Sequence, residues 1–251
     1  MSSETNSRTS GDRFPDTRWS AIVAAASRDK AERDRALDTL ISAYWKPVYK
    51  YVRIKWNKSH EDAADLTQGF FAKSIEKNFF AGYDPAKARF RTFLRTCLDG
   101  FIANEEKASQ RIKRGGGAQA VSLDFESAAG ELKLTDKSHA ESPDEYFERE
   151  WARSFFGLAL DRLRDEMEAS DRSLHFQLFH FYYLGSATDD GKITHTELAA
   201  RFGLSLTNVN NYLALARREF RRILLDNLRQ ITVTDEEFRR EARLLLGAEV
   251  E

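Results

Sequence analysis

The chain has 251 residues, a formal net charge of −1, 41% hydrophobic residues and one cysteine, which together suffice for two modest domains with apolar cores. The near-zero charge excludes a protein that is basic throughout, and the single Cys97 excludes an internal disulfide. Four prolines and thirteen glycines in a chain rich in Leu, Ala, Arg and Glu predict an all-α protein.

The first segment, residues 1–13, is rich in Ser and Thr and has few apolar side chains, which predicts a disordered tail. The polar N-terminus predicts that there is no signal peptide. No run of eighteen apolar residues occurs, so we expect no membrane span. These two expectations predict a cytoplasmic location.

Residues 14–114 are expected to form a first helical domain. A short helix around Trp19 precedes Arg28 to Arg35, a charged stretch that we interpret as a solvated turn. From Ala36 onward apolar residues recur at helical spacing, which predicts a long helix. Pro47 is expected to kink this helix, because proline removes a backbone donor and clashes with the previous turn.

The next helix is expected to begin near Ser59, which has a capping-box-like spacing to Asp62. One strip of acidic, amide and aromatic side chains is predicted to be exposed on this helix: Glu61, Asp62, Asp65, Gln68 and Phe71. From the residues alone, such a strip is either a solubility surface or a site for a protein partner.

A loop over residues 78–88 follows, with three aromatic residues that are either anchors into the core or platforms for unstacked bases: Phe79, Phe80 and Tyr83. Asp84 and Pro85 are expected to start another helix, whose apolar stripe includes Cys97 as an inert thiol rather than a nucleophile. Its polar side chains lie off that stripe or along its continuation to Arg114: Lys87, Arg89, Arg91, Arg95, Asn104, Lys107 and Arg111.

Residues 115–143 are expected to be a flexible acidic linker. The glycine triplet at its start breaks the preceding helix and lacks the Lys-Ser/Thr of a phosphate-binding loop. The charge changes sign here, because Ala86–Arg114 has eight Lys and Arg against three acids, and Asp124–Glu150 has nine acids against three bases.

A second helical domain is predicted over residues 144–230, beginning with a long amphipathic helix at Glu145–Glu168. Ser173 is expected to cap the helix that follows. The C-terminal extension, residues 231–251, contains one more expected short helix at Asp235–Leu246.

The segment Thr194–Arg222 has the pattern of a helix-turn-helix. Thr194 and Glu197 have capping-box spacing, Gly203 supplies a positive-φ residue, and Ser205 is a natural N-cap. The second helix has an apolar stripe that starts at Leu206.

The cap and the polar face of this second helix provide the candidate DNA contacts: Ser205, Thr207, Asn208, Asn210, Asn211, Arg217, Arg218 and Arg221. Asn side chains hydrogen-bond base edges and Arg side chains neutralise phosphates, so this face suits DNA. An ordinary two-helix hairpin with a solvated basic face is the alternative.

The residues suggest no catalytic or metal site. The five histidines have no metal-ligand spacing with Cys97 or with acids, and no nucleophile-elbow, kinase or Rossmann motif occurs. We therefore expect no enzymatic activity, no cofactor and no metal.

Two helical regions, the strip EDAADLTQGFF, the following DPAKARFRTFL, an acidic linker and a terminal helix-turn-helix together resemble the bacterial RNA polymerase sigma factors of the extracytoplasmic-function group. The likeness covers about Leu37–Arg114 and Glu145–Leu228. It implies that the first domain binds the polymerase core and melts the minus-10 promoter element, and that the helix-turn-helix binds the minus-35 element.

For the candidate residues, the resemblance implies that the strip from Glu61 to Phe71 contacts polymerase, and that the loop Asn78–Arg89 and the next helix hold flipped non-template bases. Three features depart from the family pattern. Gly69 stands where an acid is common, Glu105 and Glu106 dilute the basic end of the melting helix, and asparagines replace a frequent basic residue on the DNA-reading helix. The last difference shifts the expected base preference toward adenine.

Two alternatives to a sigma factor stay open. One is a stand-alone helix-turn-helix regulator that does not bind polymerase core, and the other is a sigma-like adaptor that binds protein but not DNA. The sequence also leaves open whether an anti-sigma factor or the C-terminal tail silences the protein. The six acids after Thr234 suggest a tail that folds over the basic helices.

Overall fold

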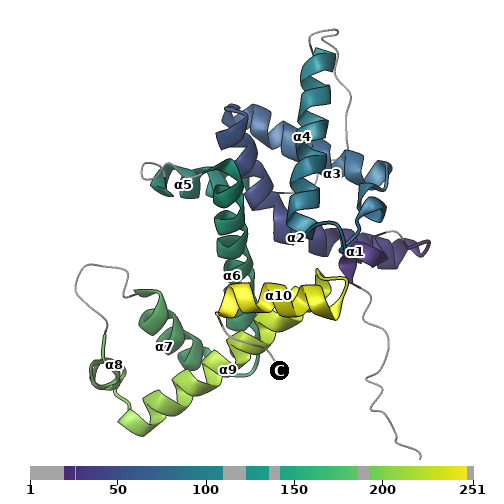
Figure 1. Ribbon diagram of the computed structural model, residues 1–251. Coiled ribbons are helices and arrows are strands. Elements are labelled where there is room, and N and C mark those ends of the chain that lie inside the picture. The colour runs from purple at the N-terminus through teal and green to yellow at the C-terminus, as the bar shows by residue number, and fades with distance from the viewer. Residues whose placement is uncertain (1–19, 26, 110–122, 136–141, 186–192, 248–251) are drawn as a thin grey trace, which may run out of the picture.

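The computed structural model describes residues 20–25, 27–109, 123–135, 142–185 and 193–247, and every regular element in these ranges is helical (Figure 1). The all-α prediction is therefore confirmed. None of the described helices combines the length and the apolar character that crossing a membrane requires. The predicted tail at residues 1–13 lies outside the described residues.

Among the described residues up to Ser109 there are five helical elements: α1 (Ala21–Ala24), α2 (Lys30–Lys55), α3 (His60–Glu76), the 3-10 helix η1 (Phe79–Gly82) and α4 (Phe90–Ser109). Helix α2 begins earlier than predicted, because the Asp29 side chain accepts the backbone N–H of Glu32 and caps it. The expected turn at Arg28–Arg35 is therefore wrong for most of its length. The helix also continues through Pro47 to Lys55.

Helix α2 is the central element of the core. It packs against α1, α3, α5 and α6, so that consecutive residues from Pro47 to Val52 are all buried. Within this run the helix is enclosed on several sides and has no polar face, and one charged residue, Lys50, is fully buried there.

Part of the predicted flexible linker forms a helix, α5 (Phe125–Thr135), which packs on α2. The Phe125 ring lies 5.4 Å from the Trp45 ring and 5.3 Å from the Tyr49 ring. Glu131 pairs with Lys46 at 2.9 Å and with Lys50 at 2.8 Å. The linker prediction is thus wrong for this segment, because an acid that suggested solvation instead pairs with α2.

Helix α6 (Pro143–Ala169) joins the two halves of the chain. Ser142 and Glu145 form a capping box at its start. Its N-terminal part packs on α2, and further along it packs on α7 and α9 (Figure 1). The described helices consequently share one buried core across the expected domain boundary at residue 144.

After α6, the part of the chain that the structure describes contains four helices: α7 (Ser173–Tyr183), α8 (His195–Phe202), α9 (Leu206–Gln230) and α10 (Asp235–Leu246). Ser173 is the first residue of α7 and does not cap it, which contradicts the expectation. The predicted helix in the C-terminal extension is confirmed with the same bounds. Helix α8 and the start of α9 lie at the opposite end of the molecule from α1–α4 (Figure 1).

Candidate nucleic-acid interface

The start of α8 has the predicted capping box. The Thr194 hydroxyl accepts the backbone N–H of Glu197 at 3.2 Å, and the Glu197 carboxylate accepts the backbone N–H of Thr194 at 2.7 Å. These bonds satisfy donors that the first turn of a helix leaves free. Because the backbone N–H and hydroxyl of Thr194 both donate to its carboxylate, the pKa of Glu197 lies below its ordinary value.

The turn between α8 and α9 also has the predicted geometry. Gly203 has φ of 64° in the left-handed region, and its backbone N–H bonds to the carbonyl of Ala199. Ser205 then caps α9, because its hydroxyl accepts the backbone N–H of Asn208 at 3.1 Å. Two helices are thereby joined by a turn of only Gly203, Leu204 and Ser205.

Helix α9 buries one face and exposes the other. Its buried residues recur at three- and four-residue steps: Val209, Leu213, Ala216, Ile223, Leu224 and Leu228. Leu206 was expected on this stripe but is 48% exposed, because it is the first residue of the helix and precedes the packed region. The predicted DNA-contact residues are all exposed: Ser205, Thr207, Asn208, Asn210, Asn211, Arg217, Arg218 and Arg221.

The three asparagines on this face differ in their bonding. The Asn210 side-chain oxygen lies 2.6 Å from Nδ1 of His195, which links the first turn of α9 to the start of α8. The side chains of Asn208 and Asn211 form no hydrogen bond within the described ranges. Their amide groups are therefore the ones available to base edges.

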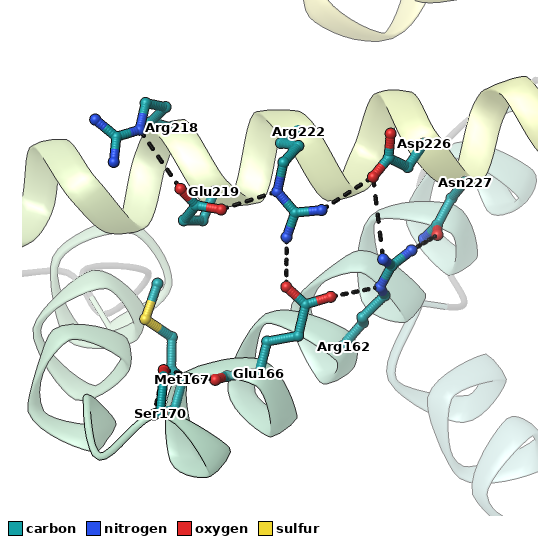
Figure 2. Close-up of polar contacts among 9 residues, drawn as sticks. All are labelled: Arg162, Glu166, Met167, Ser170, Arg218, Glu219, Arg222, Asp226 and Asn227. Atoms are coloured by element: carbon teal, nitrogen blue, oxygen red, sulfur yellow. Dashed lines mark hydrogen bonds and ion pairs between the residues drawn. The ribbon is translucent and has the colours of Figure 1, made fainter. Parts of the chain in front are cut away.

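Two arginines of α9, Arg218 and Arg222, belong to a network of ion pairs and hydrogen bonds within the protein, which Figure 2 shows. Arg222 bonds to Glu219, to Asp226 and, across the helix interface, to Glu166 of α6. Arg218 lies 3.4 Å from Glu219. The hydrogen bond from Arg222 holds the pKa of Glu219 below its ordinary value. This network fixes α9 on α6 and neutralises much of the charge of both arginines.

Arg217 and Arg221 are different, because neither forms an ion pair with any described residue. They lie one turn apart on the same flank of α9, and Asn210 precedes Arg217 by two turns on that flank. The uncompensated positive charge on this face of α9 is thus concentrated at Arg217 and Arg221.

The exposed strip on α3 is present but smaller than predicted. Ser59 caps the helix by accepting the Asp62 backbone N–H at 3.0 Å. Glu61, Asp62 and Asp65 are exposed, and Gln68 is half-buried. Phe71 is 1% exposed and packs 5.3 Å from the Phe70 ring, so its predicted exposure is wrong.

Gly69 lies on α3 where the resembled family commonly has an acid. A Cβ atom at this position would lie 3.3 Å from Cζ of Phe101 on α4. The absence of a side chain thus allows α3 and α4 to approach closely, which gives the glycine at this position a packing explanation.

The aromatic residues of the loop before α4 are core anchors in this conformation. Phe80 is 3% exposed, and Phe79 and Tyr83 are half-buried. The Phe90 ring lies 5.1 Å from Tyr83 and 5.8 Å from Phe80. The first of the two alternatives for these side chains therefore describes the structure.

Arg91 and Arg95 were predicted to lie off the apolar stripe and to contact the minus-10 element, but they are buried, at 4% and 9% exposure. The Arg91 guanidinium lies 2.7 Å from Glu148 of α6 and 2.7 Å from Glu241 of α10. Arg95 donates to the Asp144 carbonyl at 3.0 Å. The cause is non-local, because α6 and α10 cover a flank of α4 that looks polar when its sequence is considered alone.

The rest of the predicted minus-10 set lies around the ends of α4. This helix begins at Phe90 rather than at Pro85, since Asp84 and Pro85 belong to a preceding turn. Lys87 is exposed and 3.3 Å from Asp84, and Arg89 is half-buried. Asn104 and Lys107 are exposed. Arg111 lies outside the described residues.

A cavity of about 340 Å³ opens between α3 and α4, lined by Lys73, Phe79, Cys97, Phe101 and Asn104 among others. Burial raises the pKa of the Cys97 thiol, which keeps it protonated and unreactive at neutral pH. The thiol therefore contributes to the wall as a small apolar group.

Sequence reasoning missed two buried ionic clusters. One joins Lys50 to Glu131 and Glu150, and the other joins Arg91 to Glu148 and Glu241. Lys50 did give a signal, because it interrupts the apolar segment Val48 to Val52. No pattern near Glu241 indicated that its carboxylate meets α4.

Within the described ranges no group of three or more His, Cys, Asp or Glu side chains is arranged to hold a metal ion. Comparison with protein-family models, with curated proteins and with solved structures finds no match to this chain.

Proposed function

We propose that the protein is a sigma-type transcription initiation factor, in which α8 and α9 bind duplex promoter DNA and α3 binds the RNA polymerase core. The observation that carries this proposal is the exposed face of α9, with two free amides near its start and two unpaired arginines further along. The short turn at Gly203 supports it, because it sets α9 beside α8 as a DNA-binding helix requires.

The chemistry of this face matches the parts of a DNA duplex. Asn208 and Asn211 have the donor and acceptor pair that recognises adenine in the major groove. Arg217 and Arg221 follow two to three turns later, where guanidinium groups neutralise the phosphate backbone. Because Arg218 and Arg222 are held by acids, we assign the phosphate contacts to the unpaired pair.

The acidic strip on α3 supports the polymerase half of the proposal. Glu61, Asp62 and Asp65 are exposed and form no ion pair with the described residues. Unpaired acids on one helix face attract a basic protein surface and steer its approach. Phe71 is not part of this contact, because its side chain is internal.

A stand-alone DNA-binding regulator is the second candidate. It is favoured by the burial of Arg91 and Arg95, which in this conformation removes them from any contact with a melted minus-10 element. In the described conformation, the polar groups near α4 that are exposed to this element under the sigma proposal are Lys87, Asn104 and Lys107.

Binding to bacterial core RNA polymerase separates the two candidates. We expect the full chain to bind core below micromolar concentration, and Asp62→Asn with Asp65→Asn to weaken this binding while duplex binding is retained. The matched control is Asp34→Asn with Asp38→Asn, which removes two exposed acids from α2 instead. Absence of core binding, or equal loss in the control, would contradict the sigma proposal.

A duplex selection experiment tests the α9 face. Replacing Asn211 by Ala is expected to relax discrimination at one base pair by about 1–3 kcal/mol. Gln177→Ala on α7 is the control, because it removes an exposed amide outside the proposed face. Unchanged selectivity of the Asn211 variant would show that this face does not recognise bases.

A further inference from the structure

The C-terminal helix α10 places two buried carboxylates against the start of α4. Glu237 accepts the Tyr83 hydroxyl at 2.6 Å, and Glu241 lies 2.7 Å from Arg91 and 3.8 Å from Arg89. Both acids are at most 4% exposed. They occupy an aromatic and cationic surface whose donors suit an anionic ligand.

We propose that α10 is an autoinhibitory helix whose carboxylates occupy a binding site for single-stranded nucleic acid formed by Tyr83, Arg89 and Arg91. The inference rests on the proposed function, because that function is what makes nucleic acid the expected ligand of the surface beside α4. It adds that this surface is closed in the described conformation and that the chain's own C-terminal helix closes it.

The site has the chemistry that single strands require. Arg91 is held with its guanidinium carbon 3.8 Å above the Trp151 ring, so its orientation is set before any phosphate arrives. A phosphate oxygen fits the place that the Glu241 carboxylate now has beside this guanidinium, as its ion-pair partner at 2.7 Å. The Tyr83 hydroxyl, which now donates to Glu237 at 2.6 Å, becomes a donor for a phosphate oxygen once α10 has left.

The contacts of α10 suggest how it detaches. Toward α4 they are ionic or hydrogen-bonded side-chain contacts, made by Glu237 and Glu241. Toward α9 they include Arg229, which pairs with Asp235 at 3.2 Å and stacks over Phe238 at 4.1 Å. A buried ion pair gains little net free energy once desolvation is counted, so a competing polyanion displaces it more readily than an apolar contact.

Charge exchange makes nucleic acid a suitable competitor. Each phosphate that replaces a carboxylate of α10 leaves the charge at the site unchanged, so the buried guanidinium of Arg91 keeps an anionic partner throughout. The released helix follows Val233, whose backbone N–H donates to Glu237 at 2.8 Å, and it has four acids and three arginines.

The test uses the full chain with Glu237→Gln and Glu241→Gln, which remove the charges but keep the side-chain volumes. Fluorescence anisotropy measures binding to a labelled oligothymidine single strand and to a labelled duplex. We expect affinity for the single strand to rise about tenfold and affinity for the duplex to stay within twofold. The control, Glu168→Gln with Glu236→Gln, removes two exposed acids, the second from the same helix, and should leave both affinities unchanged.

Two further measurements keep the result decisive. Hydrogen exchange of the α10 amides should accelerate in the Glu237/Glu241 variant but not in the control. Adding Arg89→Ala, at a half-exposed position, should remove the gained single-strand affinity without disturbing the core.

The outcomes separate this inference from the proposed function. If duplex binding is present but single-strand affinity does not rise, or rises equally in the control, the autoinhibitory role of α10 is wrong and the duplex-binding proposal stands. If no variant binds either nucleic acid, the proposed function and this inference fail together.

Discussion

The buried ammonium of Lys50 gives the sharpest test of the packing. This side chain is 0% exposed, and its Nζ lies 2.7 Å from the equally buried Glu150 and 2.8 Å from Glu131. Lys50→Met fills the same space but leaves Glu150 without its buried cation. Removing one partner of a buried pair costs about 3–5 kcal/mol. We expect the lower end, because Arg153 remains 3.1 Å from Glu150.

A double-mutant cycle measured by urea unfolding isolates this effect. Adding Glu150→Leu to Lys50→Met should restore most of the lost stability, because an apolar pair of similar volume carries no desolvation cost. A loss below about 1 kcal/mol in the single variant, or no recovery in the double variant, would refute the buried ion pair.

Lys50→Met should also change how the stability of the protein depends on pH, because Lys50 contacts Glu131. Burial alone would raise the pKa of Glu131, but hydrogen bonds from Lys46 and Lys50 bring it below its ordinary value of 4.5. A carboxylate with a lowered folded-state pKa contributes stability that is present above pH 4.5 and is lost as the pH falls below it. Lys50→Met should therefore make the stability of the protein fall less steeply below that pH.

Three further predictions concern α8 and α9. Gly203→Ala should cost about 1–2 kcal/mol in thermal unfolding, because alanine is strained at the positive φ of this turn. Thr194→Ala should lower the hydrogen-exchange protection of α8 at neutral pH, and this difference should shrink as the pH falls below 4.5, since the pKa of Glu197 is lowered by its bonds from Thr194. Arg217→Ala with Arg221→Ala should make the binding constant for duplex less dependent on salt concentration. The slope of its logarithm against log salt concentration should fall by the amount expected for about two lost phosphate contacts.

Each of these predictions has an outcome that contradicts it. An unchanged melting temperature for Gly203→Ala would mean that the turn tolerates a side chain. A pH-independent effect of Thr194→Ala would exclude the Glu197 carboxylate from the cap. For duplex binding the control is Arg164→Ala on α6, and an equal change of salt dependence there would indicate only a general charge effect.

Local interactions explain what the sequence could predict. The capping box of Thr194 and Glu197, the left-handed Gly203 and the Ser205 cap all connect residues a few positions apart, so their spacing in the chain reveals them. The buried stripe of α9 was also predictable, because one side of that helix faces α6 and α7 while the other is free.

Contacts between distant segments explain what could not be predicted. Arg91 looks solvated beside its neighbours in the chain, but Glu148 and Glu241, which bury it, lie on two other helices. Phe71 was assigned to the wrong face because α3 buries two adjacent phenylalanines. The acidic composition around α5 suggested a flexible connector, and only the cations of α2 show why Glu131 is bound.

Promoter-dependent transcription is the most direct test of the central claim. The full-length protein is combined with bacterial core RNA polymerase and a library of linear promoter fragments, and run-off transcripts are sequenced. A sigma-type factor predicts discrete start sites with a shared upstream element, whose selection weakens in the Asn208→Ala and Asn211→Ala variants. Transcripts no different from those of core polymerase alone would contradict the account.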